Sequence, residues 1–256
     1  MKKFFLLAVM TGFMLHVPAQ KIRVLTYNIH HAQNMHGNIE LDTLAAFILA
    51  QNADVVALQE VDSMCQRSGP FDIMKELGRR TGMYYYFGKA MNYDGGGYGE
   101  GLLTRWPAES METVALPYQK DKDREPRAAI SCVLKAPGGK RVRIIATHFD
   151  HLRDSADRIM QASHLYDLYK DETLPYIIMG DLNATPSELS IKRLLEITRL
   201  PRQDKQQPTF PSGIPKSKID YILLSRRHNW KDLGYKVINE KYISDHCAVF
   251  AELRLP

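Results

Sequence analysis

Eight polar side chains of types used by hydrolytic enzymes accompany the apolar, strand-like segments of this chain. Catalytic and binding groups often gather where the strands of an open sheet end. A single Asp or Asn at such a place is an ordinary turn residue, so only the whole set indicates function. The set contains four acids, two amides and two histidines: Glu60, Asp181, Asp220, Asp245, Asn28, Asn183, His148 and His246.

These residue types suit the metal-assisted hydrolysis of a phosphate ester. Carboxylate and amide oxygens without clustered cysteines favour a hard divalent cation, Mg²⁺ or Mn²⁺. A His–Asp pair can move a proton or stabilise a developing oxyanion. Asp181, followed two residues later by Asn183, can orient a water. A cation, an oriented water and a charged histidine together suit attack on phosphorus. No G-x-S-x-G motif indicates a competing serine triad.

Strand and helix patterns alternate along the chain and must position these side chains. Helical spacing of apolar residues predicts helices over 41–49, 71–77, 155–169 and 186–195. Short apolar or β-branched runs predict strands over 22–29, 54–58, 83–87, 112–116, 128–134, 142–147, 176–179, 219–224, 235–238 and 247–253. Five glycines between 95 and 101 predict a loop beside a strand.

The elements predict one α/β domain over residues 20–256. No repeat, low-complexity linker or composition break divides the chain. Helix–strand units occur in both halves, with many strands between them, and two packed mixed sheets flanked by helices would bury all their apolar faces. The elements therefore predict two packed sheets with helices on their outer sides. The polar, proline-rich stretch 205–218 is expected to form a surface loop.

Composition excludes several classes of protein. The chain has 256 residues, 45% apolar and 25% charged, which excludes a collagen, a coiled-coil rod, a disordered tail and a multi-span membrane protein. The net charge of +5 is diffuse and forms no basic stripe, so nucleic acid is not the favoured partner. Cys65, Cys132 and Cys247 form neither a disulfide framework nor a zinc pattern. We read Cys132 and Cys247 as small core residues; whether any two cysteines pair stays open.

The first nineteen residues resemble a signal peptide. Lys2 and Lys3 precede an apolar run over residues 4–15, and Val17-Pro18-Ala19 places small residues at a cleavage site. Cleavage after Ala19 would export the protein to the periplasm or the medium. The run is short for a membrane-spanning helix, and no second long apolar run follows. We therefore expect no integral membrane contact after cleavage, and a monomer.

The chain resembles the endonuclease/exonuclease/phosphatase superfamily, which includes DNase I-like nucleases, neutral sphingomyelinases and inositol polyphosphate 5-phosphatases. The matching motifs occur in family order over nearly the whole mature chain. They are TYNIHH (26–31), LQEVD (58–62), YGEGLLTRWP (98–107), ATHFDH (146–151), GDLNATP (180–186), IDYIL (219–223) and SDH (244–246). The resemblance implies a DNase I-like four-layer sandwich and Mg²⁺-dependent phosphoester hydrolysis.

The resemblance also implies residue roles. Glu60, helped by Asn28, corresponds to the principal metal ligand, and Asp245 to a second acidic or water-mediated contact. Asp181 corresponds to the group that orients or deprotonates water. The remaining roles concern phosphate: Asn183 helps to hold it, His148 donates to its oxygen, and His246 lies beside it, oriented by Asp220.

Three departures separate the chain from the DNA-repair members. His30 replaces an acid two residues after Asn28, His148 replaces a Tyr, and Glu100 stands where many members have Asn. They bring the chain nearer to exported bacterial hydrolases and to the hydrolase-like domain associated with GPI-anchor remodelling. His30 lacks a zinc-ligand pattern and is expected on the phosphate side of the site. Arg127 either binds the phosphate or pairs with Glu125, since a guanidinium fits both.

The sequence therefore predicts an exported Mg²⁺-dependent phosphodiesterase or phosphatase that acts on a small or lipid-linked phosphate ester, such as a phospholipid or a sugar phosphate. Two alternatives stay open: a secreted nonspecific nuclease, and a non-catalytic binding protein on the same fold. The segments 91–101, 117–127 and 203–218 are expected to choose the substrate. The identity of the ester and the number of metal ions stay undetermined.

Overall fold

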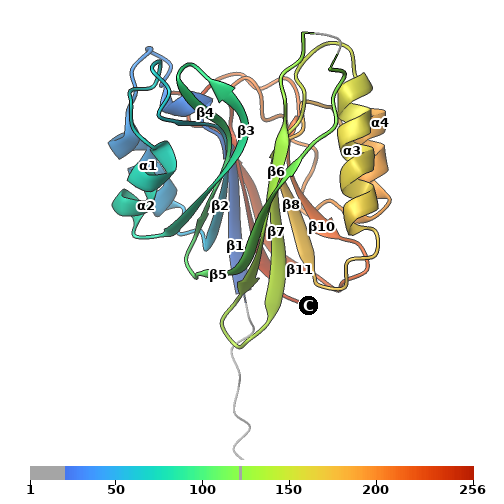
Figure 1. The fold of residues 1–256 in the computed structure, drawn as a ribbon. Coiled ribbons are helices and arrows are strands. Elements are labelled where there is room, and N and C mark those ends of the chain that lie inside the picture. Colours follow the sequence, from blue (N-terminus) through green and yellow to red (C-terminus); the bar gives the residue numbers. More distant parts are fainter. Residues whose placement is uncertain (1–20, 121–122) are drawn as a thin grey trace, which may run out of the picture.

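Two mixed six-stranded sheets form the core of the protein in the computed structural model, which describes residues 21–120 and 123–256 (Figure 1). The predicted signal peptide lies outside the described residues. The strands of the first sheet are β1 (Lys21–Asn28), β2 (Val55–Ser63), β3 (Tyr84–Tyr93), β4 (Gly96–Thr104), β11 (Lys231–Ile238) and β12 (Ala248–Arg254), in the order β11-β12-β1-β2-β4-β3. Those of the second are β5 (Ala108–Ala115), β6 (Ala128–Lys135), β7 (Arg141–His148), β8 (Tyr176–Asp181), β9 (Thr198–Arg199) and β10 (Asp220–Ser225), in the order β5-β6-β7-β8-β10-β9.

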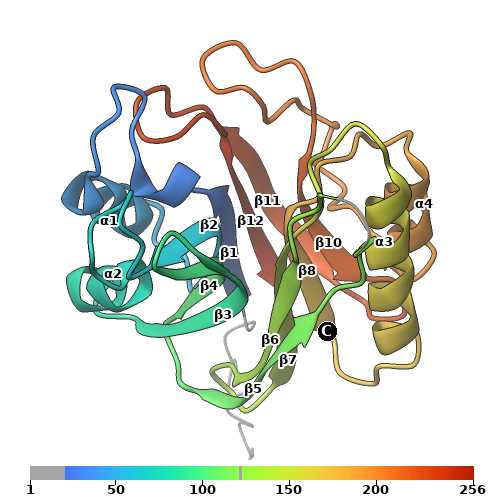
Figure 2. The same cartoon turned by 45° about the horizontal axis from the view of Figure 1, so that its top comes forward.

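Helices cover the outer face of each sheet, as Figures 1 and 2 show from two directions. The first sheet carries α1 (Leu41–Ala50) and α2 (Ile73–Thr81), and the second carries α3 (Ala156–Tyr169) and α4 (Leu189–Leu195). The predicted four-layer α/β sandwich is confirmed. No helix within the two described ranges is long and apolar enough to cross a bilayer.

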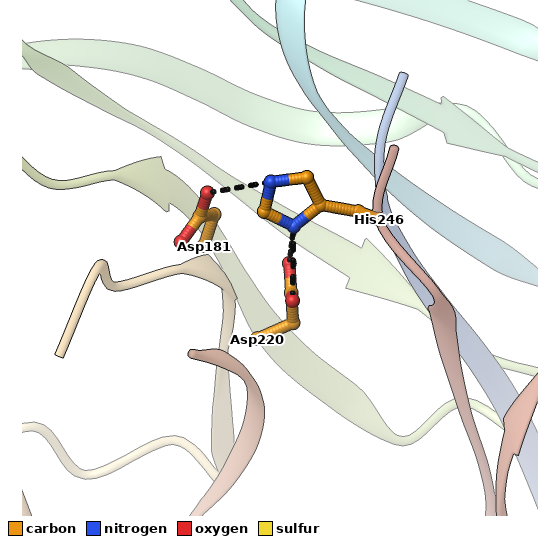
Figure 3. A group of neighbouring side chains, drawn as sticks. All are labelled: Asp181, Asp220 and His246. Carbon is orange, nitrogen blue, oxygen red and sulfur yellow. Dashed lines mark hydrogen bonds and ion pairs between the residues drawn. The ribbon is translucent and has the colours of Figure 1, made fainter. Parts of the chain in front are cut away.

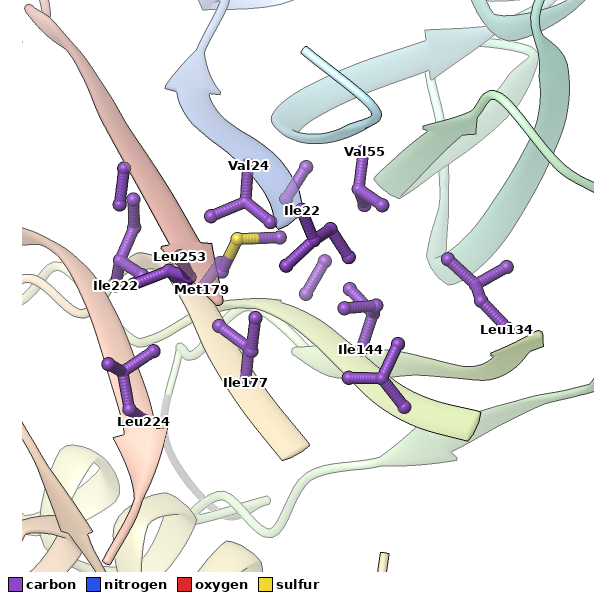
Figure 4. Packing of buried hydrophobic residues seen from close by; sticks show 14 of the residues in the cluster. Ile22, Val24, Val55, Leu134, Ile144, Ile177, Met179, Ile222, Leu224 and Leu253 are labelled. Carbon is purple, nitrogen blue, oxygen red and sulfur yellow. The ribbon is translucent and has the colours of Figure 1, made fainter. Parts of the chain in front are cut away.

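Both faces of the central strands are buried, which explains their nearly continuous apolar sequences. On β1, Val24 joins the core between the two sheets, whereas Leu25 packs under α1 and α2. This alternation follows from the two-residue period of a strand. Figure 4 shows Val24 in the inter-sheet core with Ile144 from β7 and Met179 from β8. All three cysteines are buried and unpaired, so the prediction that Cys132 and Cys247 are core residues is confirmed.

One parallel pair in each sheet brings the predicted strand ends to the same edge of the molecule. β1 and β2 are parallel and connected through α1, and β7 and β8 are parallel and connected through α3. In the register, His148 pairs with Asp181, and Asp181 pairs with Asp220 on antiparallel β10. Three predicted site residues therefore lie side by side across three strands.

Of the five glycines predicted to form a loop, Gly95 lies in a turn and the other four lie in a strand. Residues 96–104 form β4, hydrogen-bonded between β2 and β3. A Cβ atom on Gly99 would lie 2.1 Å from the carbonyl oxygen of Gly88, and one on Gly101 would lie 2.2 Å from Sδ of Met74. The glycines thus permit close packing against a strand and a helix, a use of glycine that resembles a loop signal in sequence.

Several element boundaries differ from the prediction, among them those of the second strand and the fourth helix. The second strand continues to Ser63 instead of ending at Leu58, and a bulge falls between Leu58 and Val61. The fourth helix begins at Leu189 instead of Pro186, and Leu189 is exposed instead of facing the core. The amide of Thr185 donates to Glu188 Oε1, which holds residues 185–188 as a turn before the helix.

Candidate active site

Six of the eight predicted side chains line one cavity of about 300 Å³ at the edge where the two sheets present their strand ends. They are Glu60, His148, Asp181, Asn183, Asp245 and His246. Asn28 and Asp220 are completely buried and contact these lining residues. The first sheet and its loops contribute Asn28, Glu60, Asp245 and His246, whereas the second contributes His148, Asp181, Asn183 and Asp220.

The carboxylate of Asp181 lies at the centre of the cluster. Its Oδ2 accepts from Asn28 Nδ2 at 3.2 Å and lies 3.5 Å from His148 Nε2 and 3.6 Å from His246 Nε2. Its Oδ1 accepts from the backbone amide of Asn183 at 2.9 Å. Burial raises the pKa of Asp181, and the nearby charge of Asp220 adds to the rise, whereas His246 opposes it. A buried carboxylate with a raised pKa suits a general base near neutral pH.

His246 lies between two carboxylates, as Figure 3 shows. Its Nδ1 donates to Asp220 Oδ2 at 3.1 Å, and its Nε2 faces Asp181. Burial alone would lower the pKa of His246, but Asp220 and Asp181 raise it to about 10. The imidazole is therefore positively charged at neutral pH. The ring of Phe210 packs against it with centroids 4.7 Å apart, which fixes the plane of the imidazole.

His148 is neutral, and Arg127 determines its tautomer. Burial and the charges of Arg127 and His246 lower the pKa of His148 well below its usual range. Arg127 Nη1 lies 3.1 Å from His148 Nδ1, and a guanidinium can only donate. Nδ1 therefore accepts, and the ring proton resides on Nε2, which lies 3.5 Å from Asp181 Oδ2. Asn183 Nδ2, 2.9 Å from Nε2, is then a second donor and forms no hydrogen bond with this nitrogen. This N–H is a suitable donor to a phosphate oxygen.

Two of the polar site residues have a strained backbone conformation, which determines the direction of their side chains. Glu60 has φ of 58° at the bulge of β2, and Asn183 has φ of 46° just after β8. Non-glycine residues rarely adopt positive φ, and such conformations cluster at functional sites. The side-chain Nδ2 of Asn183 donates to the carbonyl oxygen of Phe149, and this bond fixes the Asn183 side chain beside His148.

The oxygen ligands around Glu60 fit a divalent cation. Glu60 and Asp245 both face the cavity. Asn28 donates through Nδ2 to Glu60 Oε1 at 2.9 Å, so it orients this carboxylate and does not itself present an oxygen to a cation. Within residues 21–120 and 123–256, neither carboxylate pairs with a basic side chain. Anionic oxygens without a protein counter-charge are what Mg²⁺ requires. Asp181, Asp220 and His246 also have ligand atoms within 4.8 Å of one another, but Asp220 and His246 already bond to each other.

The structure shows where the two basic side chains, Arg127 and His30, lie relative to the cavity. Arg127 lines the cavity and also pairs with Glu125, Nη2 to Oε2 at 2.7 Å, so both of its predicted contacts are compatible. The side chain of His30 is not among those that line the cavity. Its backbone amide instead donates to Asn28 Oδ1 at 3.1 Å, which orients the Asn28 amide.

Arg67 is the main lining residue that the sequence did not indicate. It follows β2 in an irregular segment with no motif, and its ion pair with Asp62 holds its guanidinium at the cavity. Residues from all three segments expected to choose the substrate do reach the cavity: Tyr93, Glu125 and Phe210 represent one segment each. Their place in these segments was the only available signal.

Comparisons with known proteins identify the family of the chain. Residues 25–246 match the model of the Endonuclease/Exonuclease/phosphatase family. A comparison with curated protein sequences found no match. Among solved structures, an endonuclease/exonuclease/phosphatase from Beutenbergia cavernae has a TM-score of 0.79 at 23% identity, covering 92% of this chain and 72% of its own.

Two further structures share the fold. A mannosyl-6-phosphatase from Bacteroides thetaiotaomicron has a TM-score of 0.73 at 19% identity and covers 91% of this chain and 99% of its own. The human Nocturnin catalytic domain with a bound sulfate anion has a TM-score of 0.70 at 20% identity. It covers 92% of this chain and 95% of its own. The matched region spans every site residue from Asn28 to His246. The chain therefore belongs to the endonuclease/exonuclease/phosphatase family, whose members are hydrolases of phosphoester bonds.

Proposed function

We propose that the protein is an exported, Mg²⁺-dependent phosphoesterase that hydrolyses a small phosphate ester. The observation that carries the proposal is the position of Asp181 Oδ2, within 3.6 Å of the three nitrogen atoms of Asn28, His148 and His246. A water beside this oxygen can be deprotonated at the point where neighbouring donors hold a phosphate. Mn²⁺ has the same ligand preference and is expected to substitute.

Each residue has a role that follows from its protonation. Asp181 accepts the proton of the attacking water. The charged His246, held by Asp220, and the Nε2–H of His148 donate to phosphate oxygens, whose charge grows in the transition state. Asn183 and Arg127 orient the phosphate. Glu60 and Asp245 would hold a divalent cation, with Asn28 orienting the Glu60 carboxylate, and the cation would supply Lewis-acid stabilisation of the same charge.

The charges of the cavity favour a small ester over a nucleic acid. Arg67 and Arg127 line the cavity, and each is paired with a carboxylate, that of Asp62 or of Glu125. A nuclease relies on unpaired basic groups along an extended groove. The cavity volume of about 300 Å³ is at the lower end for small-molecule sites. A sugar phosphate or the head group of a phospholipid fits these conditions, and the Bacteroides thetaiotaomicron relative is a mannosyl-6-phosphatase by name.

Hydrolysis by the purified protein tests the proposal. The substrates are plasmid DNA, sphingomyelin, inositol phosphates, hexose phosphates and bis-p-nitrophenyl phosphate, each with Mg²⁺ and with EDTA. We expect turnover of a small ester that requires the cation and falls about 10²–10⁴-fold in Asp181→Asn. Asp171→Asn, at an exposed acid, is the control. Activity that survives EDTA, or an Asp181→Asn protein that is fully active, would contradict the mechanism.

Export is proposed from the signal-like residues 1–19. We expect the protein recovered from the periplasm or the medium to begin at Gln20, as read by N-terminal sequencing. Recovery of the intact chain from the cytoplasm alone would exclude export.

A further inference from the structure

One wall of the cavity is separate from the groups that act on phosphorus. Arg67, Tyr93, Tyr98 and Glu125 form this wall, which we call the outer subsite. The guanidinium carbon of Arg67 lies 4.4 Å from the ring centre of Tyr93 and 5.5 Å from that of Tyr98. Tyr98 reaches Arg127 Nη1 at 3.5 Å, and Arg127 pairs with Glu125. These contacts connect the four residues to Arg127, whose guanidinium also contacts His148.

Arg67 is held rigidly before any substrate arrives. Its Nε and Nη2 each donate to Asp62 at 2.8 Å, and Asp62 is completely buried. Its backbone amide donates to Asp94 Oδ2 at 2.6 Å, which ties the segment after β2 to the β3–β4 turn. A bidentate pair stacked on aromatic rings fixes a guanidinium in one orientation. The conformational entropy of this side chain is therefore lost when the protein folds, and binding of a substrate does not reduce it further.

The outer subsite carries no net charge. Asp62 neutralises Arg67, and Glu125 neutralises Arg127. A second phosphate would meet carboxylates at each guanidinium, so the wall does not suit a dianionic or oligophosphate ligand. An acyl chain would need a continuous apolar lining, whereas this wall alternates aromatic rings with charged groups.

The combination suits a ring that bears many hydroxyl groups. Carboxylate and guanidinium groups bond to neighbouring hydroxyls as acceptor and donor, respectively. The ring of Tyr93, which is 38% exposed, offers apolar surface to the C–H bonds of a sugar. The ring of the buried Tyr98 packs beside it, with centroids 6.0 Å apart. A cavity of about 300 Å³ limits the bound alcohol to about one such ring.

We infer that the outer subsite binds the alcohol part of the substrate, and that this alcohol is a monosaccharide. The substrate class is therefore a sugar phosphate, and Arg67 and Tyr93 determine specificity for it. This inference rests on the proposed phosphoesterase function, with the phosphate bound between His148 and His246 and the sugar against Tyr93.

Two variants of the purified protein test the subsite. Tyr93→Leu removes the ring at an exposed position, and Arg67→Lys keeps a charge opposite Asp62 but loses the planar fork. Tyr84→Leu is the matched control, because Tyr84 is an exposed tyrosine at the other end of the same strand. The measurements are kcat and KM for a hexose 6-phosphate and for glycerol 3-phosphate, together with the inhibition constant of inorganic phosphate.

We expect the wild type to prefer the hexose phosphate. In both variants KM for this substrate should rise about tenfold or more, while the inhibition constant of inorganic phosphate stays within twofold. Tyr84→Leu should match the wild type. An equal loss for phosphate and hexose phosphate would show a general disturbance of the site and overturn the inference.

The possible outcomes distinguish a failure of the sugar subsite from a failure of the proposed phosphoesterase function. If the protein hydrolyses glycerol phosphate or a nucleotide as well as a hexose phosphate, the sugar subsite is wrong and the phosphoesterase function stands. If no phosphoester is hydrolysed and phosphate does not bind, both are wrong. Unchanged KM for the hexose phosphate in both variants overturns the subsite alone.

Discussion

At the scale of single residues, the charge of His246 couples stability to pH. Asp220 and Asp181 raise its pKa to about 10, above the value near 6.5 expected in the unfolded chain. The resulting stabilisation is complete below pH 6.5 and is lost as the pH rises through 10. We expect the difference in unfolding free energy between the wild type and His246→Gln to exceed about 1 kcal/mol at pH 6.5 and to shrink towards pH 10.

Urea unfolding at several pH values measures this difference. His36→Gln, at an exposed histidine, is the control and should give curves parallel to the wild type. A difference between wild type and His246→Gln that grows with pH would contradict the charged state assigned to His246.

Glu100 is a buried acid that the proposed mechanism does not use. It is completely buried on β4, and neither carboxylate oxygen has a hydrogen-bond partner within the described residues. Burial raises its pKa well above the usual range; Arg127 opposes the rise, and Glu60 and Asp181 add to it. The folded state therefore loses stability as the pH rises above about 4.5, where the unfolded chain ionises.

Glu100→Gln removes this penalty without a change of shape. We expect the metal-free variant to be more stable than the wild type by about 1–3 kcal/mol at pH 8, with a smaller gain at pH 5. Thermal and urea unfolding in EDTA check this, with Glu112→Gln on exposed β5 as control. A variant less stable than the wild type at pH 8 would show that the carboxylate makes a contact worth more than its burial costs.

At the scale of elements, the glycines of β4 set how closely strands and helix pack. A Cβ on Gly99 would meet the backbone of Gly88, which cannot move without breaking the β3–β4 ladder. We expect Gly99→Ala to lose about 1–3 kcal/mol or more of unfolding free energy. Gly234→Ala in β11 is the matched control, because its Cβ would lie 3.8 Å from Glu252. Equal stability of the two variants in urea would refute the packing role.

The sequence predicted the elements whose patterns are local. Continuous apolar runs identified β7 and β8, and the polar residues at their ends identified His148 and Asp181. The sequence failed where a residue's role depends on a distant neighbour. In the sequence Gly99 is typical of a loop, because its close contact with β3 exists only in the folded protein. The positive φ of Glu60 arises from a bulge opposite β4. Arg67 carries no local signal, since the rings of Tyr93 and Tyr98, which lie under its guanidinium, become its neighbours only after folding.

At the scale of the whole molecule, the site exists only because two sheets pack against each other. Asn28 from β1 donates to Asp181 from β8, and Asp220 from β10 bonds to His246 before β12. The order of motifs along the chain indicated membership of a family, and the family implied this sandwich. Residue spacing alone cannot give the distances between the sheets, because the inter-sheet core sets them.

The same arrangement predicts that a divalent cation stabilises the folded protein. Glu60 and Asp245 come from the first sheet and its loops, Asp181 comes from the second, and their negative charges converge on one cavity. In the unfolded chain these carboxylates are far apart and bind Mg²⁺ weakly, so binding shifts the equilibrium towards the folded state. At a cation concentration of 100 times Kd the gain is about 2.7 kcal/mol.

Thermal unfolding with increasing Mg²⁺ measures this gain without any substrate. We expect Tm to rise with the concentration of Mg²⁺, to fall again with EDTA, and to be insensitive to Mg²⁺ in Glu60→Gln. Asp171→Asn, which removes one exposed acid and hence the same charge, should keep the full shift. If both variants lost the shift equally, nonspecific screening would explain it. If Glu60→Gln kept the shift, the cation would bind elsewhere, and Glu60 would have to act on the substrate directly.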